Sequence, residues 1–228
     1  MSVEQGVMRR VLADQIKERL LQDILDGRYL PDTRLVELQI ARELGTSQAP
    51  VREALRGLEA LGVVEITPFR GARVRRPSTR EILEAYAVRT ELEVLACRMA
   101  VPRLSEADLD ALDGYLDEMR RAARAGDAHA VALADAGFHA RIVRLSGNGA
   151  LERVWRGLEP FSRTLITLIL PGADPQWTAD LHAPIVAAFR VRDTELAVAA
   201  IRRHFEEAEK MAARLWGDDG YPASTLSR

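Results

Sequence analysis

The residues from Leu35 to Leu61, LVELQIARELGTSQAPVREALRGLEAL, decide the fold of the first part of the chain. Apolar residues recur at helical spacing on both sides of Gly45: Leu35, Leu38, Ile40 and Ala41 before it, and Val51, Leu55, Leu58 and Leu61 after it. Gly45 can take the left-handed conformation that ends a helix. Ser47 and Pro50 suit the cap and first turn of the next helix. The stretch therefore predicts two short helices joined by a tight turn.

Such a helix pair is typical of helix-turn-helix proteins, which place the second helix in the DNA major groove, although short helical hairpins without this function are also common. The residues that follow favour DNA binding. Residues 63–67 and 72–75 read as strands, and Pro68-Phe69-Arg70-Gly71 reads as the turn between them. A β-hairpin after a helix-turn-helix predicts a winged helix. A further helix is expected from Met8 to Leu25, with residues 1–8 irregular.

The composition is that of an ordinary globular protein, with 47% hydrophobic and 29% charged residues and a net charge of −2. A chain of 228 residues is long enough for two domains. No apolar run approaches the roughly 20 residues of a membrane helix, and no secretory signal opens the chain. Cys97 is the only cysteine, which excludes an internal disulfide. We therefore expect a cytoplasmic protein.

After residue 76 the sequence shows only helical periods separated by stop signals. We expect six helices, at about residues 79–101, 105–125, 128–146, 149–170, 176–191 and 194–216. The predicted fold is mainly α, with an N-terminal winged helix-turn-helix and a C-terminal all-α six-helix bundle. The expected divisions are a DNA-binding domain at 9–76, a linker at 77–79, an effector-binding and dimerisation domain at 80–216, and a disordered tail at 217–228.

Four residues of the helical part are candidate metal ligands. Asp135 and His139 lie four residues apart and project from one helix face. His182 and His204 fall in the last two predicted helices, so three of the four histidines of the chain belong to this set. Three imidazoles and one carboxylate suit a divalent transition metal, with zinc favoured and nickel or manganese as alternatives. The spacing alone is weak evidence, because a lone helical histidine is usually a core or surface group.

Residues 10–76 resemble the N-terminal domain of the GntR family of bacterial transcription regulators. The matching residues are Arg34-Leu35-Val36-Glu37, Leu44-Gly45-Thr46-Ser47, Pro50-Val51-Arg52-Glu53-Ala54-Leu55, Leu58, Leu61-Gly62 and Arg70-Gly71. The resemblance implies that Arg52 contacts DNA from the second helix. It also implies that Arg34, Arg70 and Gly71 reach the DNA backbone or minor groove.

The tip of the reading helix departs from the family pattern. Many relatives have S-R-T-P where this chain has Ser47-Gln48-Ala49-Pro50. Glutamine can read adenine through two hydrogen bonds, and alanine can contact a thymine methyl group. We therefore expect Ser47, Gln48 and Ala49 to read an operator that differs from the common family half-site at these base steps.

Residues 79–216 resemble the FCD effector domain of one GntR subgroup. The likeness rests on Arg89 with Glu93, Asp135-x-x-Phe138-His139, Ser146-Gly147-Asn148, His182-x-x-Ile185-x-x-Ala188, Asp193, Ala197 and His204. It implies that Asp135, His139, His182 and His204 hold a metal that helps to bind a small organic acid. Arg89 would hold the other end of the acid. Alternatively, Arg89 pairs with Glu93 on a solvated face, and Asn148 caps the next helix.

These observations predict a homodimeric, ligand-responsive regulator that binds a palindromic double-stranded operator. The dimer is expected because one reading helix covers too little DNA for useful specificity. Two alternatives stay open: a regulator that senses the metal directly, and a metal-dependent enzyme with an accessory DNA-binding domain. The sequence has no H-E-x-x-H, G-x-S-x-G or glycine-rich phosphate loop, which counts against the enzyme.

Overall fold

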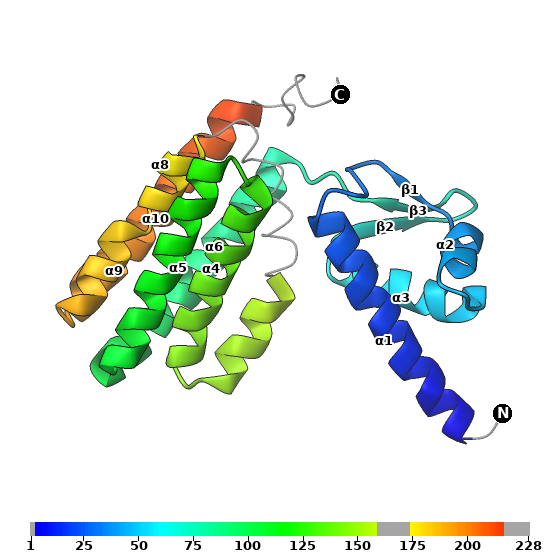
Figure 1. Ribbon diagram of the computed structural model, residues 1–228, viewed down its shortest axis with the longest axis horizontal. Coiled ribbons are helices and arrows are strands. Elements are labelled where there is room, and N and C mark those ends of the chain that lie inside the picture. Colours follow the sequence, from blue (N-terminus) through cyan, green and yellow to red (C-terminus); the bar gives the residue numbers. More distant parts are fainter. Residues whose placement is uncertain (1–2, 159–173, 217–228) are drawn as a thin grey trace. The chain divides into compact units, whose positions relative to one another are not determined.

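The computed structural model describes residues 3–158 and 174–216, and its contacts divide the chain into two compact units, Met1–Arg76 and Pro77–Arg228. Each unit is described separately. None of the helices in the described part of the chain is long and apolar enough to span a membrane. The elements of the first unit are α1 (Val3–Leu25), β1 (Arg34–Leu35), α2 (Glu37–Glu43), α3 (Gln48–Ala60), β2 (Val64–Thr67) and β3 (Gly71–Val74) (Figure 1).

The first unit is a winged helix-turn-helix, as the sequence predicts. Its antiparallel sheet has the order β1-β3-β2, and β2 and β3 form the hairpin of the wing. The apolar side of α3 is fully buried against α1 and the sheet, and the core of the unit includes Leu20, Ile24, Ile40, Val51, Leu55, Leu58 and Val74. The opposite side of α3 stays exposed, because its outward positions are polar.

The sequence-based prediction is wrong at two places in this unit. Helix α1 begins at Val3, so residues 3–8 are helical rather than irregular. Leu35 lies in β1, where it pairs with Ala72 of β3, and it does not belong to a helix. Leu38 is 44% exposed instead of buried. The two-residue strand β1 buries Leu35 through a pairing with residues far along the chain, and α2 begins only at Glu37.

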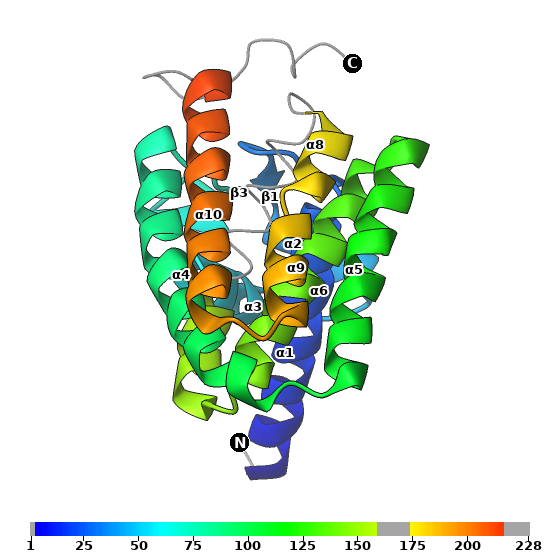
Figure 2. The same cartoon turned by 90° about the vertical axis from the view of Figure 1, so that its left-hand side faces the viewer.

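The second unit is a bundle of helices. Its elements are α4 (Thr79–Ala100), a 3₁₀ turn η1 (Val101–Arg103), α5 (Glu106–Ala125), α6 (Ala128–Leu145), helical residues 149–158, α8 (Pro175–Asp180), α9 (Ala183–Arg190) and α10 (Thr194–Trp216). Figure 2 shows α10 between α4 and α9, and α5 packs along α6. The largest fully buried side chains of this unit are Phe138, Phe189, Ile82, Leu109, Leu112, Met119 and Ile142. The mainly α fold that the sequence predicts is confirmed.

Local capping signals place the helix starts correctly. Ser78 with Glu81 and Ser105 with Asp108 form capping boxes, in which each side chain bonds to the backbone of the other residue. The Asp127 side chain accepts a hydrogen bond from the backbone N–H of Ala130. These contacts satisfy free backbone donors at the helix N-termini, which is why such short patterns predict a helix start.

One predicted helix is divided in two. The sequence-based interpretation had a single helix at 176–191, whereas the structure has α8 and α9 separated by a turn at residues 181–182. Pro184 lies in the first turn of α9. A proline has no N–H to donate and disfavours helical geometry in the residue before it, so a continuous helix is broken here. The second half of the helix predicted at 149–170 and the tail at 217–228 lie outside the described residues.

Candidate functional site

The predicted DNA-contacting residues form two groups on the first unit. Ser47 precedes α3, and Gln48, Ala49 and Arg52 lie in its first turns; three of these four are exposed and Ala49 is half-buried. The second group lines a hollow of about 380 Å³ at the wing, which includes Arg34, Arg70 and Gly71. The structure thus places all seven residues at the surface of the helix-turn-helix and wing, where double-stranded DNA could reach them.

Arg52 has a carboxylate partner that the sequence does not reveal. Its Nε lies 3.0 Å from Oε1 of Glu37, and its Nη2 lies 2.7 Å from Oε2, which makes a two-pronged pair between α3 and α2. The hydrogen bond to Glu37 raises the pKa of Arg52. Glu37 is part of the motif that matches the GntR family, but the spacing gives no sign that it would face Arg52. The pair fixes the direction of the guanidinium before any DNA binds.

The four candidate metal ligands come together in the core of the second unit. Asp135 and His139 lie on α6, His182 caps α9, and His204 lies on α10. All four side chains are buried, and their ligand atoms lie within 4.8 Å of one another. His139 Nε2 is 3.3 Å from His182 Nε2, and His182 Nε2 is 3.0 Å from Asp135 Oδ1. Two ligand atoms on a tetrahedral zinc ion would be ~3.4 Å apart.

The hydrogen bonds of the Nδ1 atoms of His139 and His182 determine whether a lone pair or a hydrogen of each ring faces the centre of this cluster. His139 Nδ1 lies 2.5 Å from the Glu93 carboxylate, and His182 Nδ1 lies 3.2 Å from the backbone carbonyl of Thr178. Carboxylate and carbonyl oxygens only accept hydrogen bonds, so both Nδ1 atoms carry the hydrogen in a neutral ring. Each Nε2 then presents a lone pair toward the other and toward Asp135. A cation between them would turn this repulsion into coordination.

Two further buried atoms fit the same interpretation. Within the described residues, Asp135 Oδ2 and His204 Nδ1 have no hydrogen-bond partner. Burial, together with His182 and His139, holds the pKa of His204 well below its usual range, so this ring is neutral and able to bind a metal. Burial opposes charge on Asp135, but the close approach of the His182 and His139 imidazoles outweighs it and lowers the pKa of Asp135. The residues present therefore suit a divalent transition metal.

Arg89 is buried beside the cluster, where it pairs with Glu93. Its Nη2 lies 2.9 Å from Glu93 Oε1, and its guanidinium lies over the rings of Trp155 and Phe205. The alternative interpretation of Arg89 is right about the partner and wrong about the surroundings, since both side chains are buried rather than solvated. Tertiary packing, which an i,i+4 pattern does not report, covers this face of α4.

Glu93 joins the candidate site, although the sequence pattern indicates only a pairing with Arg89. Its carboxylate accepts hydrogen bonds from Arg89, from His139 and from Trp155 Nε1, the last at 2.8 Å. Burial opposes charge on Glu93, but His139 and Arg89 outweigh it, and the pKa of Glu93 falls to about 2. Glu93 is therefore ionised, and it orients His139 as a carboxylate behind a metal-binding histidine does.

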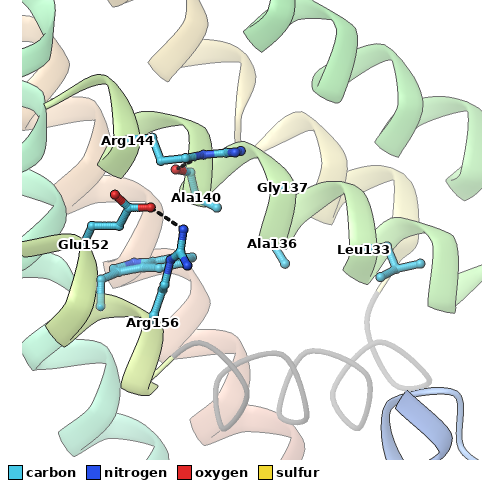
Figure 3. A pocket seen from close by; sticks show the side chains of 8 residues that line it. Leu133, Ala136, Gly137, Ala140, Arg144, Glu152 and Arg156 are labelled. Atoms are coloured by element: carbon cyan, nitrogen blue, oxygen red, sulfur yellow. Dashed lines mark hydrogen bonds and ion pairs between the residues drawn. The ribbon is translucent and has the colours of Figure 1, made fainter. Parts of the chain in front are cut away.

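Two hollows lie beside this network. One, of about 330 Å³, is lined by His204 together with Trp177, Arg203 and Glu207, and it exposes the edge of the cluster. The other, of about 410 Å³, lies between α6 and residues 149–158 (Figure 3). Figure 3 shows Glu152 bonded to Arg156 across from Ala140 and Arg144. Trp155 lines this second hollow, and the same indole donates to Glu93.

Family models match both units. Residues 12–74 match the model described as "Bacterial regulatory proteins, gntR family", and residues 84–207 match the model described as "FCD domain". The chain is 34% identical over 196 residues to a probable D-xylose utilization operon transcriptional repressor of Paenarthrobacter nicotinovorans, and the match covers 86% of each of the two chains. It is 26% identical over 208 residues to the gluconate operon transcriptional repressor of Bacillus subtilis, and the match covers 89% of this chain and 85% of that protein.

Solved structures show the same fold. Escherichia coli McbR/YncC has a TM-score of 0.76 at 23% identity and covers 88% of this chain and 96% of that chain. A transcriptional regulator from Rhodococcus sp. RHA1 also has a TM-score of 0.76, at 24% identity, over 87% of this chain and 95% of that chain. The matched families and relatives are regulators rather than enzymes. The chain belongs to the GntR family and is a DNA-binding transcriptional regulator with a C-terminal FCD domain.

Proposed function

We propose that this regulator is a homodimeric repressor whose affinity for a palindromic operator is controlled by a small organic acid bound at a divalent metal centre. The buried cluster of Asp135, His139, His182 and His204 carries the proposal. Bare imidazole nitrogens and carboxylate oxygens that face each other in an apolar core are costly unless a cation lies between them. When bound, such an ion would act as a Lewis acid that attracts a carboxylate.

The charges around the cluster favour an anionic effector. Beside the three imidazoles, the buried charged groups here are Asp135, Glu93 and Arg89, which together have a net negative charge without the ion and a net positive charge with a divalent ion. The hollow of about 330 Å³ at the edge of His204 is in the size range of small-molecule sites. Arg89 remains our candidate for the far end of the acid, and that role requires it to share its guanidinium between Glu93 and the effector.

The identity of the metal decides how an acid could bind. Four protein donors already fill a tetrahedral zinc site, whereas an ion that takes five or six ligands keeps positions free. Zinc is the ion that three imidazoles and a carboxylate favour, and nickel or manganese would more readily leave room for a carboxylate. Direct coordination of the acid therefore requires either that zinc takes a fifth ligand or that nickel or manganese occupies the site.

The proposed DNA interface is α3 with the wing. Ser47, Gln48, Ala49 and Arg52 would read the major groove, and Arg34, Arg70 and Gly71 would contact the backbone or minor groove. A dimer places two such helices on paired half-sites, which multiplies the specificity of one. Repression is supported by the names of the two relatives above, which are repressors of D-xylose utilization and gluconate operons.

The route from the effector to the DNA-reading unit is proposed to run through α4. This helix begins at Thr79, two residues after Pro77, the first residue of the second unit, and carries Glu93, which is bonded to His139. Any shift of His139 on binding of the acid would therefore act on α4 and on the linker before it. The protein must have two conformations that differ in operator affinity, and the acid can shift the balance between them only if its own affinity for the two conformations differs.

The test uses the full-length protein. Native mass spectrometry gives the mass of the dimer and the bound metal, and a duplex selected from random DNA serves as the operator. We expect organic acids from a panel to lower operator affinity at least tenfold in the metal-loaded protein and not in the metal-free protein. His182→Ala with His204→Ala should remove this response and leave basal DNA binding intact. Loss of basal binding as well would make the metal structural instead.

Direct metal sensing is the second candidate, because four protein donors alone can complete a tetrahedral site. The same assay separates the two functions. A direct sensor would change operator affinity on addition of zinc, nickel or manganese alone, and no acid of the panel would change it further.

A further inference from the structure

Phe69 at the tip of the wing is unusually exposed. Phe69 is 109% exposed, whereas no other large apolar residue within 11–78, 80–158 and 174–214 exceeds 66%. A single exposed apolar residue is ordinary on a protein surface. A phenyl ring that is exposed over its whole surface is not ordinary, because removing its apolar surface from water would be favourable.

The backbone at Phe69 is also strained. The Arg70 backbone N–H donates to the Thr67 carbonyl at 3.0 Å, which closes a four-residue turn with Pro68 in its second position. The third position has a φ of 65°, as in a type II turn. Glycine or asparagine normally occupies it, because a larger side chain is disfavoured at positive φ. Here the strained position carries an aromatic ring, and strain of this kind persists where function requires the residue.

The surroundings of the ring are cationic. Arg34 and Arg70 line the same hollow as Phe69, and neither guanidinium has an ion-pair or hydrogen-bond partner among the described residues. Gly71, directly after Arg70, has a φ of 86°, a backbone conformation that favours glycine. Two unpaired arginines beside a free phenyl ring match a polyanion that also has apolar edges, which is the chemistry of the minor groove.

We propose that Phe69 is a minor-groove wedge: its ring enters the operator's minor groove beside the half-site read by α3 and partly unstacks one base step. Arg34 and Arg70 hold the phosphates on either side. The minor groove is about 6 Å wide, which admits the tip of a hairpin but not a helix. Apolar side chains that enter it push base pairs apart and bend the duplex. This inference rests on DNA binding by the first unit and is independent of the metal and the effector.

The experiment uses full-length protein and the duplex that the wild-type protein selects from random DNA. 2-Aminopurine, whose fluorescence rises when it is unstacked, replaces one adenine at a time across the half-site. Wild-type protein should raise the fluorescence at one step outside the major-groove contacts. Phe69→Asn relaxes the turn and removes the ring, so this variant should melt at the wild-type temperature or above. It should bind the operator roughly tenfold more weakly, as expected for one base–aromatic stack, and lose the fluorescence rise.

Matched variants separate the wedge from its neighbours. Phe69→Leu keeps an apolar wedge and should retain most of both signals, and Val11→Gln, which changes an exposed apolar residue of α1, should retain both in full. Arg52→Ala in the same assay reports separately on the proposed reading helix. The proposal is overturned if Phe69→Asn keeps wild-type affinity, or if it weakens binding while the fluorescence rise persists. A loss of the dimer on size exclusion with this variant would instead assign the ring to a contact between copies, and would also overturn it.

Discussion

Each unit contains an arginine–glutamate pair, and the two pairs differ mainly in their contact with water. On α4, Arg89 and Glu93 are 2.9 Å apart with 3% and 0% of their side chains exposed. On the helix-turn-helix, Arg52 and Glu37 are 2.7 Å apart with 52% and 30% exposed. The distances are alike, but the first pair is sealed inside a core, where both Arg89 nitrogens contact one carboxylate oxygen. The second pair is two-pronged and open to water, so its arginine can exchange the carboxylate for a DNA phosphate or base.

This difference decides what each pair can do. Removal of one partner of a buried pair leaves an uncompensated charge in the core and costs about 3–5 kcal/mol, whereas an exposed pair contributes about 0–1 kcal/mol. The buried pair Arg89–Glu93 therefore belongs to the packed core around the candidate metal site. An exposed pair adds little stability, and its value is that it points the arginine in one direction.

The largest expected effect is on the buried pair. Glu93→Ala should lower the free energy of unfolding by about 3–5 kcal/mol, because it leaves Arg89 without a partner and His139 without its acceptor. Urea unfolding followed by tryptophan fluorescence measures this directly, since Trp155, Trp177 and Trp216 all lie in the second unit. Glu37→Ala is the matched control; because the first unit contains no tryptophan, its unfolding is followed by circular dichroism, and its stability should change by less than about 1 kcal/mol.

Equal losses from the two variants would contradict the comparison. A small loss from Glu93→Ala would mean that water enters the core and solvates Arg89. Circular dichroism of the same samples would show whether the variant remains folded, and the difference between the two glutamate variants is then read from the urea midpoints.

Metal removal is expected to have the next largest effect, and only on the helical unit. A ligand that binds the native state at about 100 times its dissociation constant stabilises it by about 2.7 kcal/mol, so chelation should lower the free energy of unfolding by about that amount. Tryptophan fluorescence during urea unfolding, with and without EDTA, gives the difference. His204→Ala is the control, and its stability should not respond to EDTA. An equal response of this variant would remove His204 from the metal site.

Most of the fold follows from signals that are local in the sequence. The pairs Ser78–Glu81 and Ser105–Asp108 mark helix starts because the capping contacts span three residues. Pro184 is also a local signal, since a proline inside a helical pattern marks a break, although the helix predicted at 176–191 runs across it. Strand β1 was not readable, because two residues become a strand only through their pairing with β3.

The candidate metal site shows the same limit at the level of side chains. Asp135 and His139 share a helix face in any sequence with this spacing, but only the packed bundle brings His182 and His204 to them. The role of Glu93 depends on His139 and Trp155, which lie 46 and 62 residues away. An i,i+4 pattern with Arg89 looks the same on a surface and in a core, so the burial of this pair could not be predicted.

The smallest expected effect is on DNA recognition by the exposed pair. Glu37→Gln removes a negative charge near the proposed phosphate path and loosens the two-pronged hold on Arg52. Affinity for random-sequence DNA should therefore rise by about two- to threefold, because the repulsion between Glu37 and the phosphates is lost. Affinity for the selected operator should stay equal or fall, because Arg52 is less well oriented. Fluorescence anisotropy on both duplexes at one salt concentration gives the ratio of the two affinities. A double-mutant cycle with Arg52→Ala isolates the coupling, since Glu37→Gln should have no effect on the operator ratio once Arg52 is gone. If Glu37→Gln lowers the ratio equally in the Arg52→Ala background, Glu37 contacts the DNA itself and does not act by orienting Arg52.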